Sequence, residues 1–322
     1  MPAGLVRFVL LLRLFGLSEI DTLRLLPWLF AKFPFLSRPG SDDTDRFFLT
    51  NRVRSDGGGS QVLYAFFTLA IADWLKMPYR HRPFQRIEHH TGEEDEFLHK
   101  WNRVFDFSKR FGTPGDFPVF SLGSRFQVLR ALTSRSCGVG ITSHRFRGIS
   151  DQHPKILERA RAVLREIYFP YEETIPFSSD SQGIWFHLRR GDVTPQSHPG
   201  RFTTIDSLVE DADVVSAALG LEHAPRIVVG KLESRESDSL AKKGFSTVLD
   251  GDAFRDLHHL AQAPVLVTGV SSFSYLAGLL NQSTVVFRDF WHPAMRDWIS
   301  LSAVYDTHEF EEKPAPTECR ER

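Results

Sequence analysis

The stretch Ile184-Trp185-Phe186-His187-Leu188-Arg189-Arg190-Gly191-Asp192 decides the fold of this chain. Its first five residues form a largely apolar run, which is typical of a strand buried on both faces, as in a parallel sheet with helices on either side. The run ends in two arginines and a glycine turn. Because ligands of such sheets bind where the strands end, we expect the arginines to emerge at an edge suited to an anionic ligand.

The residues that follow alternate between short apolar runs and amphipathic segments. Strands are expected at 184–188, 226–229, 265–268 and 284–287, and helices at 205–219, 253–261 and 274–280. This alternation predicts an α/β domain built on a parallel sheet with helices on both faces.

The first half of the chain contains a second α/β pattern. Phe47-Phe48-Leu49 predicts a strand, Gly57-Gly58-Gly59-Ser60 predicts a glycine turn, and the apolar residues from Val62 to Leu75 predict a helix. A further helix is expected to begin at Pro154, with Asp151 or His153 as its cap. The order of elements between 86 and 148 does not follow from the pattern.

A chain of 322 residues exceeds the usual size of one hydrophobic core, so two domains are expected. The predicted organisation is an amphipathic helical segment at 1–40, an α/β domain at 41–176, a Rossmann-like domain at 177–305, and a polar tail at 306–322.

The charges nearly cancel, with 39 Lys and Arg against 40 Asp and Glu. No overall field favours nucleic acid, so any anion site is expected to be local. Charged residues interrupt the apolar segment at 5–35, which therefore predicts no membrane-spanning helix but leaves open a peripheral membrane contact. We expect the protein to act in the cytoplasm, with the Golgi as the alternative.

Arginine suits the strand end because its guanidinium stays charged and its forked donors match phosphate oxygens. Surface salt bridges are the plain alternative. A second buried run, Val265-Leu266-Val267-Thr268, ends in Gly269 and the serines at 271, 272 and 274, directly before a helix. A helix N-terminus binds phosphate through its free amides, although the serines could simply cap the helix.

Acidic residues offer two further interpretations. Asp256 lies on a predicted helix, turned away from its apolar face, where a carboxylate could accept hydrogen bonds from guanine or simply remain solvated. Asp211-Ala212-Asp213 and Asp250-Gly251-Asp252 have the spacing of metal-binding transferases, but the first lies on a helix and the second precedes one as a cap. We therefore predict no metal site.

These residues resemble three motifs of the α1,2-, α1,6- and protein O-fucosyltransferase superfamily. The stretch from Ile184 to Asp192 is similar to the first motif, and Asp256-Leu257-His258-His259-Leu260-Ala261-Gln262-Ala263 followed by Ser271-Ser272-Phe273-Ser274 is similar to the second and third. In the first domain Ser60 stands where members of the superfamily usually have Asn.

The resemblance implies two facing Rossmann-like domains (the GT-B fold), with the acceptor side in the domain at 41–176 and GDP-sugar binding in the domain at 177–305. It also implies GDP-fucose as donor, inversion at the sugar, and neither metal nor other cofactor. It implies that Arg189 binds the β-phosphate with Arg190 beside it as the catalytic pair, that His187 and Asp256 contact guanine, and that Ser271 and Ser272 line the phosphate pocket. The implied donor-binding residues are His187, Arg189, Arg190, Asp192, Asp256, Ser271, Ser272, Phe273 and Ser274, with Gly58, Gly59, Ser60 and Gln61 as a possible donor loop.

Three functions remain open: a fucosyltransferase acting on a glycan or lipid-linked glycan, a transferase that uses another nucleotide sugar, and a non-catalytic nucleotide-sugar-binding protein. No catalytic base can be assigned. Four residues of the first domain could stack on a sugar or fill the core: Tyr79, His81, Phe84 and Trp101.

Overall fold

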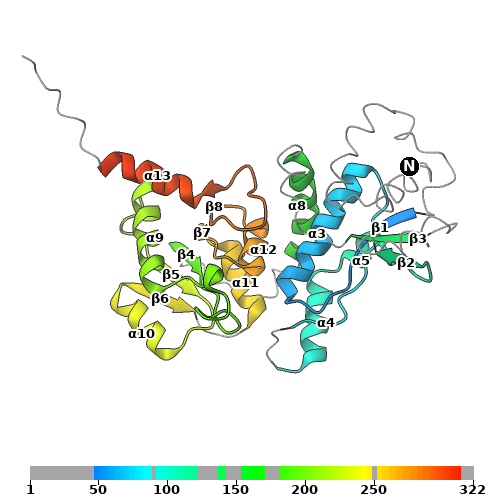
Figure 1. Ribbon diagram of the computed structural model, residues 1–322, viewed down its shortest axis with the longest axis horizontal. Coiled ribbons are helices and arrows are strands. Elements are labelled where there is room, and N and C mark those ends of the chain that lie inside the picture. The colour runs from blue at the N-terminus through cyan, green and yellow to red at the C-terminus, as the bar shows by residue number, and fades with distance from the viewer. Residues whose placement is uncertain are drawn as a thin grey trace, which may run out of the picture. The chain divides into compact units, whose positions relative to one another are not determined.

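The computed structural model describes residues 47–88, 92–121, 137–141, 154–170, 182–248 and 252–312. The chain divides into two compact units (Figure 1). Unit 1 comprises the chain through Thr174 together with Trp291–Met295, and unit 2 comprises Ile175–Phe290 and the residues from Arg296 onward. The segment 291–295 thus joins the first unit although it lies within the second half of the chain. The predicted segment at 1–40 lies outside the described residues.

Unit 1 contains a three-stranded parallel sheet in the order β1-β3-β2. Its elements are β1 (Phe47–Asn51), α3 (Gly58–Leu75), α4 (Glu94–Val104), α5 (Phe107–Phe111), β2 (Val119–Ser121), β3 (Cys137–Ile141) and α8 (Pro154–Tyr168). Helix α3 packs against β1 and α8 and is buried along most of its length, as expected for a helix that is apolar on all sides.

The predicted glycine turn is instead the start of α3, which begins at Gly58. A side chain at Gly58 would place its Cβ 2.3 Å from the ring of Trp101, so close packing against α4 requires glycine there. The four aromatic residues considered as sugar platforms are all buried: Tyr79, His81, Phe84 and Trp101. They fill the core of unit 1.

Unit 2 is built on a six-stranded sheet in the order β6-β5-β4-β7-β8-β9, with every pair parallel. Its elements are β4 (Ile184–His187), η3 (Pro199–Arg201), α9 (Ile205–Ala218), β5 (Arg226–Val229), α10 (Ser234–Lys242), β6 (Phe245–Val248), α11 (Ala253–Gln262), β7 (Val265–Val267), α12 (Ser272–Leu280), β8 (Thr284–Phe287), β9 (Ile299–Ser300) and α13 (Leu301–Glu312). The predicted fold class, α/β with parallel sheets and helices on both faces, is confirmed.

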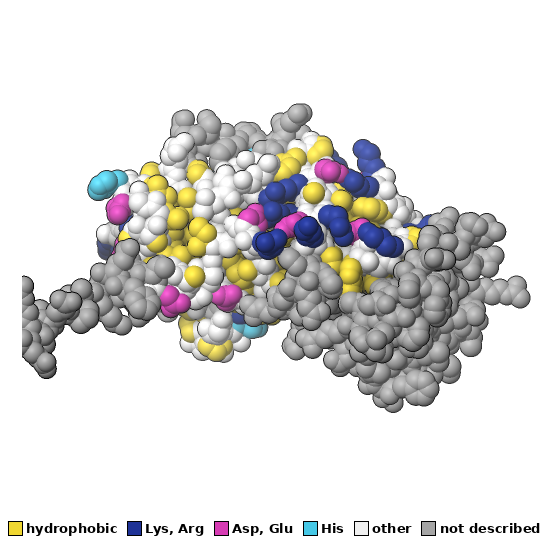
Figure 2. All heavy atoms as spheres, turned by 90° about the horizontal axis from the view of Figure 1, so that it is seen from above, with side chains coloured by type: hydrophobic (Ala, Val, Ile, Leu, Met, Phe, Trp, Pro, Cys, Tyr) yellow, Lys and Arg dark blue, Asp and Glu magenta, His cyan; other side chains and the backbone are white. Residues whose placement is uncertain are grey.

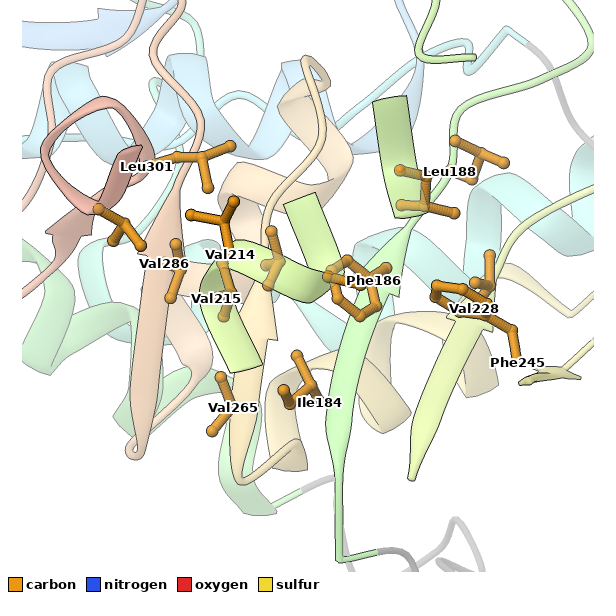
Figure 3. Close-up of a cluster of buried hydrophobic side chains, with 14 of the residues drawn as sticks. Ile184, Phe186, Leu188, Val214, Val215, Val228, Phe245, Val265, Val286 and Leu301 are labelled. Atoms are coloured by element: carbon orange, nitrogen blue, oxygen red, sulfur yellow. The ribbon is translucent and has the colours of Figure 1, made fainter. Parts of the chain in front are cut away.

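Alternate residues of β4 point to opposite faces of this sheet. Ile184, Phe186 and Leu188 join a hydrophobic core with residues of α9, α10 and α13 (Figure 3). On the other face, Trp185 stacks on His259 of α11, with ring centroids 5.6 Å apart. Helices α9, α10 and α13 therefore cover one face, and α11 and α12 cover the other.

Helix α13 corrects the predicted polar tail. It runs from Leu301 to Glu312, so that residues 306–312 are helical. Leu301 and Val304 are buried in the core, and the hydroxyl of Tyr305 donates to Asp211 Oδ1 at 2.9 Å. Buried apolar residues and this hydrogen bond hold the helix to α9.

Among the described residues, no helix combines the length and the apolar character needed to cross a membrane. On the face seen in Figure 2, acidic side chains lie among the basic ones. That mixture agrees with the nearly balanced charge of the whole chain.

Candidate functional site: the carboxyl edge between β4 and β7

The strand order places a topological switch point between β4 and β7. From β4 the chain passes outward to β5 and β6, then crosses back to β7 on the other side of β4 and continues to β8 and β9. This is the order 3-2-1-4-5-6 of doubly wound nucleotide-binding sheets, whose ligands lie outside the carboxyl ends of the two strands where the order reverses. Residues 188–192 of the first predicted motif directly follow β4, and the predicted motif at 271–274 comes shortly after β7.

The backbones of the two strand ends approach each other closely. A Cβ on Gly269 would lie 2.6 Å from the carbonyl oxygen of His187, so this position after β7 has room only for glycine. The close approach brings the α12 N-terminus next to the end of β4.

His187 lies beneath the switch point, with 8% of its surface exposed. Its ring packs against Phe273 at a centroid distance of 5.3 Å. Burial, with a smaller effect of the Arg189 charge, lowers the pKa of His187 to about 3, so the ring is neutral at physiological pH. Its Nδ1 atom is buried without a hydrogen-bond partner among the described residues, and a ligand or water would recover the free energy that this costs.

Arg189 emerges at the carboxyl edge and remains partly accessible. Its Nη2 atom lies 2.7 Å from Oδ1 of Asp192, and the two side chains are 24% and 22% exposed. Gly191 has φ of +82°, which favours glycine and lets the chain reverse so that Asp192 meets Arg189. Asp192 thus pairs with the first arginine rather than the second.

Arg190 corrects the prediction of a second phosphate-binding arginine. Its side chain is only 7% exposed, and its Nε atom lies 2.7 Å from Oε1 of Glu236 in α10. Its Nη1 and Nη2 atoms donate to the carbonyls of Arg189 and Thr203, each at 3.0 Å. The guanidinium also stacks over Phe202 at 4.2 Å, so Arg190 acts as an internal brace.

The three serines at the start of α12 differ in exposure to solvent. Ser271 is the N-cap and accepts from the amide of Phe273 at 3.2 Å, so the capping alternative holds for this residue. Ser274 is fully buried and donates to the Gly269 carbonyl at 2.8 Å. Ser272, which begins the helix, is half-buried. Ser272 and the amides of the first turn are thus the groups of α12 best placed for an anion.

Asp256 lies in the first turn of α11, where Asp252 caps the helix by accepting from the amide of Phe254 at 2.8 Å. Helix α11 returns from β6 to β7 and so runs opposite to the strands. The stack of His259 on Trp185 fixes the height of the helix relative to the strand. Asp256 lies three residues before His259, about 4.5 Å closer to the carboxyl edge of the sheet. His187 lies two residues after Trp185, about 6.6 Å closer to the same edge. The half-buried Asp256 and His187 therefore lie on the same face of the sheet at a similar height.

The possible donor loop belongs to unit 1. Gly58, Gly59, Ser60 and Gln61 form the first turn of α3. The side-chain amide of Gln61 is buried and donates to the carbonyls of Asp56 and Arg86 at 2.8 Å and 2.5 Å, so it anchors the neighbouring backbone.

The first acidic pair considered as a metal site diverges. Asp211 is buried and pairs with Arg288, whereas Asp213 pairs with Arg226 at 2.7 Å. In the second pattern, only Asp252 lies within the described residues. Across the described segments, no three His, Cys, Asp or Glu side chains gather as metal ligands would.

No protein-family model and no curated protein matches this chain. Among solved structures, it resembles the crystal structure of POFUT1 in complex with GDP, with 11% identity and a TM-score of 0.40 over 77% of this chain and 99% of that one. The structure of the NodZ alpha-1,6-fucosyltransferase co-crystallized with GDP has 13% identity and a TM-score of 0.41, over 76% of this chain and 95% of that one. The structure of the fucosyltransferase NodZ from Bradyrhizobium has 13% identity and a TM-score of 0.40, over 76% of this chain and 96% of that one. What this chain binds must be inferred from its own residues.

Proposed function

We propose that this chain is a glycosyltransferase that moves fucose from GDP-fucose to a glycan-type acceptor, with inversion at the sugar and without a metal ion. One observation carries the proposal: the residues that resemble the donor-binding motifs converge at the switch point of a doubly wound sheet. Arg189 follows β4, and the N-terminus of α12 follows the neighbouring strand β7. An accessible guanidinium and a set of helix amides together fit a diphosphate.

We assign the nucleotide contacts by position on this edge. Arg189 donates to the β-phosphate, and Ser272 with the first-turn amides of α12 binds the remaining phosphate oxygens. Asp256 accepts from the adjacent N–H groups of guanine. The neutral ring of His187, held against Phe273, contacts the base or orders a water molecule beneath it.

The proposed reaction is one displacement. The acceptor hydroxyl oxygen attacks the anomeric carbon, the bond from that carbon to the β-phosphate oxygen breaks, and GDP leaves with the bonding electrons. The hydroxyl proton passes to a general base. Arg189 lowers the barrier because negative charge on the departing phosphate increases as the bond breaks, and a guanidinium fixed in place stabilises that charge.

We expect the acceptor to be a free or lipid-linked glycan and the reaction to take place in the cytoplasm. A contact of residues 5–35 with a membrane surface would bring the active site to a lipid-linked acceptor. Co-sedimentation with liposomes, measured for the full chain and for a variant that lacks residues 5–35, checks this contact.

The function is tested by the release of GDP from GDP-fucose with a panel of glycan acceptors, in the presence of a chelator. GDP-mannose and UDP-sugars serve as competing donors, and Arg189→Met serves as the variant without the phosphate contact. We expect transfer only from GDP-fucose, and its loss in the variant. Transfer from a UDP-sugar that depends on manganese would overturn the proposal.

A further inference from the structure

The loop after β4 folds back on itself in successive turns. The hydroxyl of Ser197 donates to the carbonyl of Asp192 at 3.1 Å, and the amide of Ser197 donates to Thr194 Oγ1 at 3.0 Å. The amide of His198 then donates to the carbonyl of Thr194 at 3.0 Å, and that of Arg201 to the carbonyl of His198 at 2.9 Å. This chain of hydrogen bonds carries η3 back toward the turn that holds Arg189 and Asp192.

Arg190 joins the two ends of this loop. One guanidinium donates to the carbonyl of Arg189 at the start and to the carbonyl of Thr203 at the end, and it stacks on Phe202. Because Phe202 directly follows Arg201, the same brace fixes the backbone on which Arg201 sits. Glu236 holds the brace in place from α10.

Arg201 lies in the same charge cluster as Arg189 and Asp192. It is half-buried, and its Nε atom is shielded from solvent. Burial lowers the pKa of Arg201, the nearby Asp192 charge raises it, and the Arg189 charge lowers it again. The charges of both neighbours therefore reach this guanidinium.

We propose that Arg201 is the second cation of the diphosphate site, the role that the sequence pattern assigns to Arg190. The inference rests on the proposed function and specifies how its phosphate site is built. The charge of Arg189 opposes the charge of Arg201, whereas that of Asp192 favours it. A diphosphate bound by both guanidiniums offsets the repulsion between the two arginines.

The test measures the binding of inorganic diphosphate by calorimetry, so that it does not depend on recognition of a base. We expect Arg201→Met to weaken binding roughly 10- to 100-fold, as expected for the loss of charge-assisted hydrogen bonds. Arg201→Lys keeps the positive charge but lacks the forked N–H donors of the guanidinium, so it should retain part of the affinity for diphosphate. Lys242→Met, at the exposed end of α10, should bind like the wild type.

Circular dichroism and thermal unfolding of each variant establish that it is folded. Equal diphosphate affinity of the wild type and Arg201→Met overturns the inference, as does the absence of diphosphate binding to the wild type. If diphosphate binds through Arg201 but GDP binds no more tightly than ADP or UDP, the inference stands and the proposed donor is wrong.

Discussion

The side chains of Arg189 and Arg190 point to opposite faces of the sheet, because successive side chains of β4 alternate between the two faces. The odd-numbered residues of β4, Trp185 and His187, face α11 and α12. Arg189 continues that side, whereas Arg190 continues the side of Phe186 and is drawn toward Glu236 of α10. A strand period of two residues thus separates the arginine proposed to bind the ligand from a structural one.

Replacement of the brace should affect both stability and binding. Arg190→Met leaves Glu236 without its partner and frees the carbonyls of Arg189 and Thr203, so we expect a loss of about 2 kcal/mol in the free energy of unfolding. Urea denaturation measures that loss, and calorimetry should show weaker diphosphate binding. Arg235→Met, an exposed substitution on the same helix, is the control. Unchanged stability with lost binding would make Arg190 a direct ligand contact instead.

Burial of His187 predicts a dependence of stability on pH. The pKa of this ring is about 3 in the folded chain, against an ordinary value of 6.5, so only the unfolded chain takes up a proton between these values. Stability therefore falls as the pH falls through that window, by about 1 to 2 kcal/mol between pH 7 and pH 5 from this group.

Urea denaturation of the wild type, His187→Asn and the exposed-site control His223→Asn at both pH values measures this contribution. His187→Asn should show a smaller difference between pH 7 and pH 5 than either of the others. Equal differences in all three proteins would mean that His187 is protonated in the folded state.

The sequence pattern predicts Arg189 as a site residue, but it predicts neither the structural role of Arg190 nor the proposed role of Arg201. Arg190 reads as a ligand residue because its partner, Glu236, lies 46 positions further on in a helix that the pattern does not predict. Arg201 follows Pro199 and Gly200 in a segment without apolar periodicity. The hydrogen bonds of the loop bring Arg201 toward Asp192, and such bonds produce no periodic pattern in the sequence.

At the scale of elements, the site depends on how closely β7 approaches β4. Gly269→Ala would push a methyl group against the His187 carbonyl, where the Cβ would lie 2.6 Å away. We expect a loss of about 1 to 3 kcal/mol in the free energy of unfolding, because backbone cannot yield as a flexible side chain does. Binding of GDP should weaken as well.

Gly200→Ala is the matched control, because a Cβ there meets nothing within 4 Å. Both variants are compared with the wild type by urea denaturation and calorimetry. If Gly269→Ala behaved like Gly200→Ala, the two strand ends would not be in contact in solution.

In unit 2, elements with a buried apolar run or face could be predicted from the sequence, and elements at the margin of the sheet could not. The bounds of β5 and β8 match the predicted runs because these strands are buried on both faces. Helix α10 and strand β6 are not predicted, since Leu240 is the one buried residue of the helix, and β6, at the sheet edge, buries fully only Phe245. Elements at the margin of a sheet bury too little to produce a periodic pattern.

For the whole molecule, the two units should respond differently to the nucleotide. The proposed GDP contacts lie in unit 2, so GDP should slow hydrogen exchange there, chiefly around β4, β7 and α12. At about 100 times its dissociation constant, a ligand stabilises the form that it binds by about 2.7 kcal/mol. The β1-β3-β2 sheet of unit 1 is the internal control, and protection of that sheet alone would contradict the assignment of the site.

The segment Trp291–Met295 interrupts unit 2 along the chain. It belongs to unit 1 although the residues on either side belong to unit 2, and His292 stacks on Phe67 of α3 at 5.5 Å. The alternation of strands and helices predicts two domains but not this excursion. The segment buries His292 and Met295 without a periodic run of apolar residues.

The most direct test is calorimetry of GDP, UDP and ADP with the wild type and Arg189→Met, in the presence of a chelator. The site at the carboxyl edge of β4 and β7 predicts that GDP binds the wild type most tightly, without metal, and that Arg189→Met loses most of that affinity while it remains folded. Equal binding of GDP to the two proteins, or binding of UDP in preference to GDP, would contradict a GDP-sugar site built on Arg189.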